Sequence, residues 1–186
     1  MNRSAEIHPR AGAGRAISTA LATVFGDLFL VFGTLFCASL AVAVGWIPPR
    51  GNLIYRVARL WSRGLLRFSG VTLEVHREVE LDPLTPYVFM SNHQSLYDIP
   101  ALIASLPGQT RFLAKRSLFR IPVFGWAIHM GGFISIDRED RSRAHQSFSS
   151  AVARLRSGVS ALVFPEGTRS LDGRLLPFQR GGFLLA

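Results

Sequence analysis

The hydrophobic pattern separates an N-terminal helical part from a C-terminal part with shorter apolar runs. Residues 28–47 form an apolar run of twenty residues without a charge, which is long enough to cross the hydrocarbon core of a bilayer. In residues 50–70, arginines and apolar residues recur at spacings of three and four. This pattern predicts a basic amphipathic helix at an anionic membrane surface. A buried core helix and an ordinary surface helix are the respective alternatives.

After residue 70 the period of the pattern changes. Short apolar, β-prone runs occur as "VTLEV", "YVFM", "FISI" and "SALVF". Between them, residues 117–130 and 141–156 have helical patterns. Strands that alternate with helices predict an α/β domain. We therefore divide the chain into a basic tail (1–16), a membrane-associated helical segment (17–70) and an α/β domain (71–186).

The composition favours anionic partners and excludes two structural uses of cysteine. The net charge is +9, and Lys115 is the single lysine among 21 basic residues. Such a chain favours anionic partners, namely nucleic acid, anionic lipid or phosphorylated substrates. Cys37 is the one cysteine, which excludes an internal disulfide and a cysteine-based zinc site. If residues 28–47 span a membrane, the five arginines that follow them favour a cytoplasmic C-terminal part.

The stretch "SNHQSLYDIP" follows the apolar run "YVFM" and contains His93 and Asp98. On an unbroken helix, residues five apart point roughly 140° away from each other. The two side chains meet only if the chain turns between them and a helix starts near Asp98, which Pro100 favours. A carboxylate that binds one imidazole nitrogen leaves the other nitrogen as a base. The alternative is a capping aspartate beside a surface histidine.

A second polar cluster, "FPEGTRS", follows the run "SALVF". Pro165 and Gly167 predict a tight loop that exposes backbone N–H groups, and Arg169 offers planar donors suited to phosphate. Glu166 is a candidate to hold a substrate hydroxyl or to orient an arginine. A turn with a surface salt bridge is the alternative. Because open α/β sheets bind ligands beyond the carboxyl ends of their strands, we expect these clusters to share one site.

Four sequence blocks occur over residues 90–183, namely "NHQSLYD", "GGFISIDR", "FPEGTRS" and "LLPFQRGGF". Taken together and in this order, they resemble the blocks of the glycerolipid acyltransferase family with the NHxxxxD signature. Bacterial 1-acylglycerol-3-phosphate acyltransferases are the most similar members. The resemblance implies a mixed sheet flanked by helices, preceded by a membrane-associated helical element. In the fourth block, Gln179 stands where lysine is common.

The resemblance implies transfer of a fatty acyl group from acyl-CoA or acyl-carrier protein to the sn-2 hydroxyl of lysophosphatidate. His93 would be the general base and Asp98 its orienting partner. The glycerol phosphate would be bound by Lys115, Arg138, Glu166, Gly167, Thr168 and Arg169. The same resemblance implies no metal, no cofactor and no nucleic-acid partner.

The expected location is the inner membrane of the cell, with an anionic membrane surface as partner and the site on the cytoplasmic side. Family members usually continue past the fourth block, so we expect the domain to be cut short at Ala186. Three alternatives remain: acylation of another lysolipid such as a lyso-ornithine lipid, a non-catalytic lipid-binding protein, and a hydrolase that uses His93 to activate water. Against the hydrolase, the chain has no GxSxG elbow.

Overall fold

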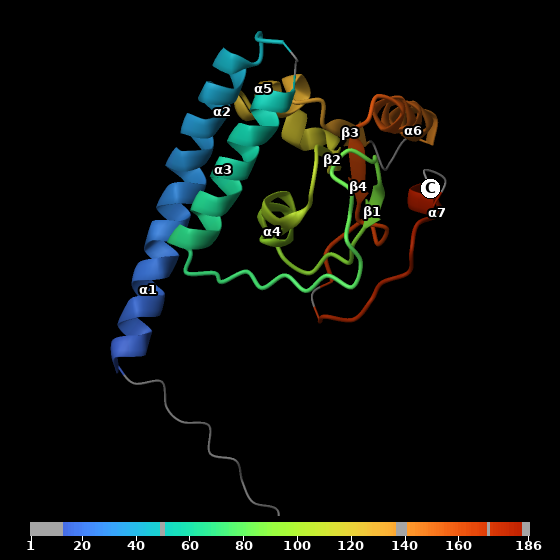
Figure 1. Cartoon of the computed structure of the whole chain (residues 1–186). Helices are drawn as coiled ribbons and strands as arrows, with labels where there is room; N and C mark the ends of the chain where they lie inside the picture. The colour runs from blue at the N-terminus through green and yellow to red at the C-terminus, as the bar shows by residue number, and fades with distance from the viewer. Residues whose placement is uncertain (1–12, 49–50, 137–140, 171, 184–186) are drawn as a thin grey trace, which may run out of the picture.

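A four-stranded sheet forms the centre of the computed structural model, which describes residues 13–48, 51–136, 141–170 and 172–183. The strands are β1 (Val88–Met90), β2 (Thr110–Lys115), β3 (Ile134–Ile136) and β4 (Ser160–Val163). They lie in the order β1-β4-β2-β3 (Figure 1). All three neighbouring pairs are parallel, so the carboxyl ends of the four strands meet at one edge. The predicted α/β fold is confirmed.

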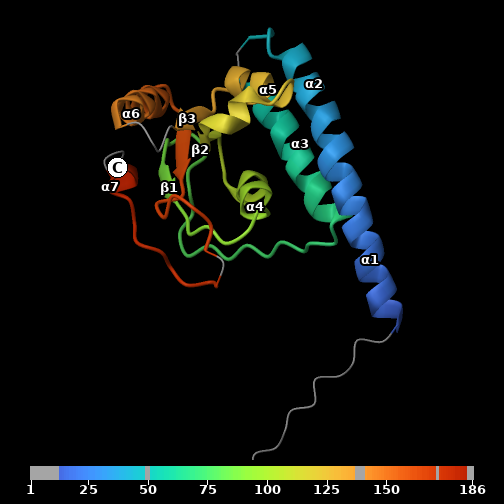
Figure 2. The ribbon, with the colours of Figure 1, turned by 180° about the vertical axis from the view of Figure 1, so that it is seen from behind.

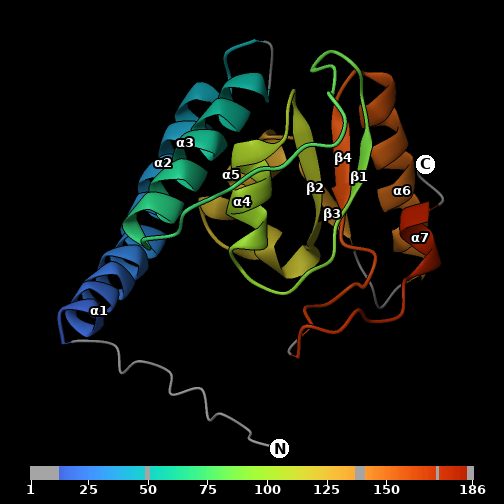
Figure 3. The same cartoon turned by 60° about the horizontal axis from the view of Figure 1, so that its bottom comes forward.

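Helices cover both faces of this sheet. On one face, α6 (Arg141–Arg156) places Ala151 against Leu113 and Val163. On the other, α3 (Asn52–Phe68) and α4 (Asp98–Ser105) pack around Leu162. Leu162 and Val163 are neighbours in β4 that point to opposite faces, as the two-residue period of a strand requires. Figure 3 shows the sheet between α6 and the helices α3 and α4.

The predicted N-terminal helices form a layer outside α3. Helix α1 (Ala13–Leu28), the π-helical turn η1 (Phe29–Gly33) and α2 (Thr34–Val44) follow one another along a single rod (Figure 2). Within it, Ile17–Val44 is long and apolar enough to cross a membrane, and 17% of its most apolar window is buried. The rod packs on α3 through Ala38, Ala41 and Ile54. It therefore exposes most of its apolar surface.

A buried arginine connects this helical layer to the sheet. Arg111 of β2 donates hydrogen bonds to the carbonyl oxygens of Gly51, just before α3, and of Gly131, just after α5 (Phe124–Met130). Its guanidinium lies 4.9 Å from the centre of the Tyr55 ring. Burial lowers the pKa of Arg111 to about 10. The short helices η2 (Arg116–Arg120) and α7 (Arg180–Phe183) complete the described elements.

Three of the four predicted strands are confirmed, and one is wrong. "VTLEV" (71–75) is not a strand, because its exposed residues have no neighbouring strand to pair with in the described part of the chain. Strand β2 was not predicted, since Arg111 interrupts its apolar pattern; tertiary contacts bury that arginine. The helix predicted over 117–130 is split into η2 and α5.

The amphipathic helix predicted after residue 50 is confirmed as α3, with a different role for one arginine. Arg59 does not face outward: its guanidinium donates to the carbonyl oxygens of Ile103 and Leu106 at the end of α4. Tyr55, also on α3, belongs to the same buried cluster as Phe112 and Leu162 of the sheet. The domain boundary predicted after residue 70 stays a prediction. Side chains from both sides of it pack together in this buried cluster.

We expect Leu162→Ala to lower the free energy of unfolding by about 2–5 kcal/mol, because it leaves a cavity in the middle of the sheet. Leu162 is 1% exposed. The matched control is Leu175→Ala, which removes the same atoms from a side chain that is 66% exposed. Chemical denaturation of the detergent-solubilised protein measures both. Equal losses for the two variants would contradict the assignment of Leu162 to the core.

Candidate active site

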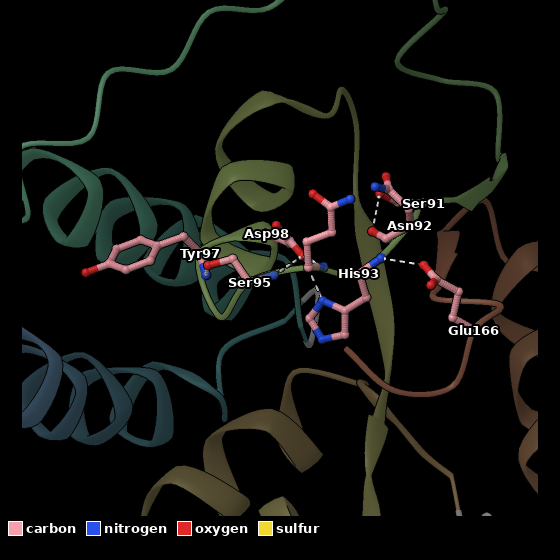
Figure 4. A network of polar contacts seen from close by, with 8 residues as sticks. Ser91, Asn92, His93, Ser95, Tyr97, Asp98 and Glu166 are labelled. Atoms are coloured by element: carbon pink, nitrogen blue, oxygen red, sulfur yellow. Dashed lines mark hydrogen bonds and ion pairs between the residues drawn. The ribbon is translucent and has the colours of Figure 1, made fainter. Parts of the chain in front are cut away.

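The His93 and Asp98 side chains meet, as the sequence led us to expect. Nδ1–H of His93 donates to Oδ2 of Asp98 at 2.8 Å, since a carboxylate can only accept. The pair lies in the loop that leaves the carboxyl end of β1 (Figure 4). Among the described residues, no group hydrogen-bonds to Nε2 of His93. The arrangement fixes one tautomer and leaves Nε2 as a base.

Local backbone geometry explains how residues five apart meet. Helix α4 begins at Asp98, so residues 93–97 are free to turn, and Pro100 occupies the first turn of the helix. Oδ2 of Asp98 also accepts the backbone N–H groups of Gln94 at 2.7 Å and Ser95 at 2.9 Å. One carboxylate oxygen therefore shapes the loop and orients the imidazole.

The electrostatics keep Asp98 ionised. Partial burial on its own raises the pKa of this carboxyl. Three hydrogen bonds to the charged form, from Ser95, His93 and Gln94, together with the positive charge of a protonated His93, outweigh burial and lower the pKa below its usual value. At neutral pH the group is thus a carboxylate that accepts a hydrogen bond from Nδ1–H of His93.

The second predicted cluster lies beside His93, because β4 is the neighbour of β1 in the sheet. The Phe164 ring stacks on the imidazole with centroids 4.0 Å apart and an interplanar angle of 16°. Ser170 N–H donates to the carbonyl oxygen of His93 at 2.8 Å. Both residues lie in the predicted cluster "FPEGTRS", but neither was assigned a role of its own. The sequence signal that could have identified both is their position on either side of "PEGTR", directly after an apolar strand.

Glu166 is almost fully buried, and both of its carboxylate oxygens are engaged. Oε1 accepts the backbone N–H of His93 at 2.8 Å, and Oε2 accepts that of Leu176 at 2.9 Å. Figure 4 shows the bond from the His93 backbone to Glu166. Gln179 N–H also donates to the carbonyl oxygen of Pro165 at 2.7 Å. The third and fourth sequence blocks therefore converge on the histidine loop.

The predicted phosphate-binding residues, apart from Glu166, are not held against His93 by contacts of the kind described above. Gly167 has a φ of 74°, in the left-handed region that favours glycine, and it turns the chain so that Thr168 and Arg169 are exposed. Lys115 is exposed at the carboxyl end of β2. Within the described residues, no hydrogen bond or ion pair connects Lys115 or Arg169 to His93. Arg138 lies outside the described residues.

No metal site emerges from the described part of the chain. There, no three histidine, cysteine, aspartate or glutamate side chains come together as candidate ligands. Cys37 is buried in α2, outside these loops.

We expect Asp98→Asn to destabilise the protein in a pH-dependent way. The folded-state pKa of Asp98 is depressed, so its carboxylate stabilises the fold above the unfolded pKa of about 3.9. This contribution disappears as the pH falls through the lower, folded-state pKa. The difference in Tm between wild type and variant should thus shrink in acid. Thermal unfolding between neutral and acid pH measures it, with Asp27→Asn on the exposed side of α1 as control. A constant difference would contradict a charge effect.

Sequence and structure comparisons place the chain among known proteins. The Acyltransferase family profile matches residues 72–186. The 1-acyl-sn-glycerol-3-phosphate acyltransferase alpha of Homo sapiens is 38% identical over 82% of this chain and 54% of its own length. The chloroplastic enzyme LPAT1 of Arabidopsis thaliana is 36% identical, over 75% of this chain and 39% of its own length. The chain thus spans only about half the length of these relatives.

A solved structure agrees with the fold. The crystal structure of the 1-acyl-sn-glycerophosphate acyltransferase PlsC from Thermotoga maritima superimposes with a TM-score of 0.74 at 23% identity. The match covers 92% of this chain and 70% of that one. Together with the family profile, which covers more than half of the residues, these matches show that the chain belongs to the acyltransferase family.

Proposed function

We propose that this protein transfers a fatty acyl group from acyl-CoA or acyl-carrier protein to the sn-2 hydroxyl of 1-acylglycerol-3-phosphate, which yields phosphatidate for phospholipid synthesis. The observation that supports this most strongly is the His93–Asp98 pair with Nε2 left open. Such a pair needs no serine or cysteine nucleophile when the substrate brings its own hydroxyl. Relatives named 1-acyl-sn-glycerol-3-phosphate acyltransferase support the choice of acceptor.

The chemistry follows from the open nitrogen. The acceptor hydroxyl donates its proton to Nε2 of His93 while its oxygen forms a bond to the thioester carbonyl carbon. The C–S bond then breaks, and the leaving thiolate takes the proton back from Nε2. General-base help of this kind is worth on the order of 10²–10⁴ in rate. Asp98 stabilises the imidazolium that exists between the two proton transfers.

The acceptor's phosphate needs cations and N–H donors near this base. We propose that Arg169, Thr168 and the turn at Gly167 supply them, with Lys115 and Arg138 assisting. Lys115 is exposed at the carboxyl end of β2, and Arg169 is exposed in the loop that follows β4. The histidine loop leaves the sheet at the same edge. Glu166 belongs to the same loop, and its carboxylate is occupied by backbone N–H groups.

Two other functions make different demands on these residues. A lyso-ornithine lipid presents no equivalent phosphate, so its acylation would not require Arg169. A non-catalytic lipid-binding protein would not require the His93–Asp98 pair at all. The hydrogen bond between these two side chains, which fixes the tautomer of the imidazole, favours catalysis over binding alone.

We further propose that the apolar rod of α1 and α2 places the protein on the inner membrane with its site on the cytoplasmic side. Large apolar side chains are exposed along the rod, including Val31, Phe32, Leu35 and Phe36. Arg56, Arg63 and Arg67 of α3 are exposed as well, which suits an anionic lipid surface. Exposed apolar area of this extent is unusual on a water-facing helix.

The decisive assay combines purified protein, labelled acyl-CoA or acyl-carrier protein, and a panel of lysolipids. We expect transfer to lysophosphatidate, and a loss of about 10²–10⁴-fold in kcat for His93→Ala, since the general base is removed. His129→Ala, on α5, is the matched control. Transfer only to lysolipids without a phosphate would favour the lyso-ornithine alternative, and binding without turnover would reject the enzyme.

For the membrane surface, we expect Val31→Ser combined with Leu35→Ser to reduce flotation with vesicles that contain anionic lipid, because apolar area leaves the bilayer contact. The matched control is Val79→Ser combined with Leu84→Ser, a pair that is even more exposed but lies far from the rod in sequence. Substitution is preferable to deletion, since α3 contributes Tyr55 to the core. Equal flotation of both double variants would contradict a bilayer contact through α1 and α2.

A further inference from the structure

The Glu166 side chain is the one buried carboxylate among the described residues, at 4% exposure. Each of its oxygens accepts a backbone N–H from a different segment, His93 on one side and Leu176 on the other. Hydrogen bonds to an ionised acceptor are stronger than neutral ones, and a buried carboxylate is tolerated only when such donors satisfy it. The carboxylate is thus a structural link between two loops.

The loop after β4 holds His93 from three directions. Glu166 accepts its backbone N–H, Ser170 donates to its carbonyl oxygen, and Phe164 stacks on its ring. Asp98 accepts a hydrogen bond from one ring nitrogen, Nδ1. The backbone contacts set where the Cα of His93 lies, and the ring contacts set where Nε2 points. A displaced Cα would therefore move the base even with the Asp98 bond intact.

We infer that Glu166 is a positioning residue for the general base, and that it does not bind the phosphate of the acceptor. Charge supports this role: a phosphate monoester carries about −1.5 to −2 at neutral pH, and a buried carboxylate beside it would repel it. The exposed Arg169, three residues later, has the opposite charge. The inference rests on the proposed acyl transfer, and it divides the loop into a positioning part and a binding part.

The kinetic test uses Glu166→Gln in the full chain. Its amide keeps one acceptor oxygen but turns an N–H group toward one of the two backbone donors. We expect kcat to fall by about 10²-fold, as a small misplacement of a catalytic group does, while KM for lysophosphatidate is unchanged. Arg169→Ala should show the reverse, with a raised KM. Glu74→Gln, an exposed glutamate, is the matched control for the amide substitution.

A second readout does not depend on activity. Amide hydrogen exchange should be faster at His93 and Leu176 in Glu166→Gln than in wild type, with the amide of Leu162 as a reference for global stability. If the glutamine variant does not fold, Glu166→Asp replaces it: the charge remains, one methylene is lost, and both readouts should move in the same directions by smaller amounts.

The outcomes separate the two proposals. A raised KM with unchanged kcat in the Glu166 variants would overturn the positioning role and assign Glu166 to the acceptor. Unchanged exchange at His93 would overturn it as well. Absence of acyl transfer by the wild-type protein would reject the proposed function, and the exchange measurement would still decide whether Glu166 holds the histidine loop.

Discussion

One carboxylate oxygen organises the loop that carries His93, the proposed general base. Oδ2 of Asp98 accepts three donors: the His93 ring and the backbone N–H groups of Gln94 and Ser95. All three donors converge because the chain turns in the loop after β1 and becomes helical only at Asp98. The turn and the oriented imidazole therefore arise from the same contacts. A side chain that shapes the loop in this way also selects the tautomer that leaves Nε2 open.

The parallel sheet supplies the second half of the support. Strands β1 and β4 are far apart in sequence, yet they are neighbours and point the same way. The loops that follow them must then leave the sheet side by side. Two hydrogen bonds join those loops at His93: Glu166 accepts its backbone N–H, and Ser170 N–H donates to its carbonyl oxygen. His93, the proposed general base, is held through its backbone, its ring face and Nδ1, while Nε2 stays open among the described residues.

The helical layer and the site are also connected. The Tyr97 hydroxyl, one residue before α4, donates to Oγ of Ser69 at the end of α3 at 2.8 Å. Two residues of α3 hold α4 deeper in the domain. Arg59 donates to the carbonyl oxygen of Ile103, and Tyr55 belongs to the same buried cluster as Ile103. The rod of α1 and α2 packs in turn on α3, the same helix whose end is joined to the histidine loop by the bond between Tyr97 and Ser69.

The sequence by itself determined the elements whose signal is local. The apolar rod, the amphipathic helix α3, three short strands and the start of α4 near Pro100 all follow from periodicity, charge and turn chemistry within a few residues. The His93–Asp98 pair was predictable for the same reason, since both partners lie in one loop. The local pattern was wrong for "VTLEV", because a strand exists only where another strand pairs with it. It also missed β2, whose buried Arg111 donates to the carbonyl oxygens of Gly51 and Gly131 in distant segments. The tertiary structure alone decided that Phe164, Glu166 and Ser170 hold His93, since strand order, which no local pattern encodes, makes β4 the neighbour of β1.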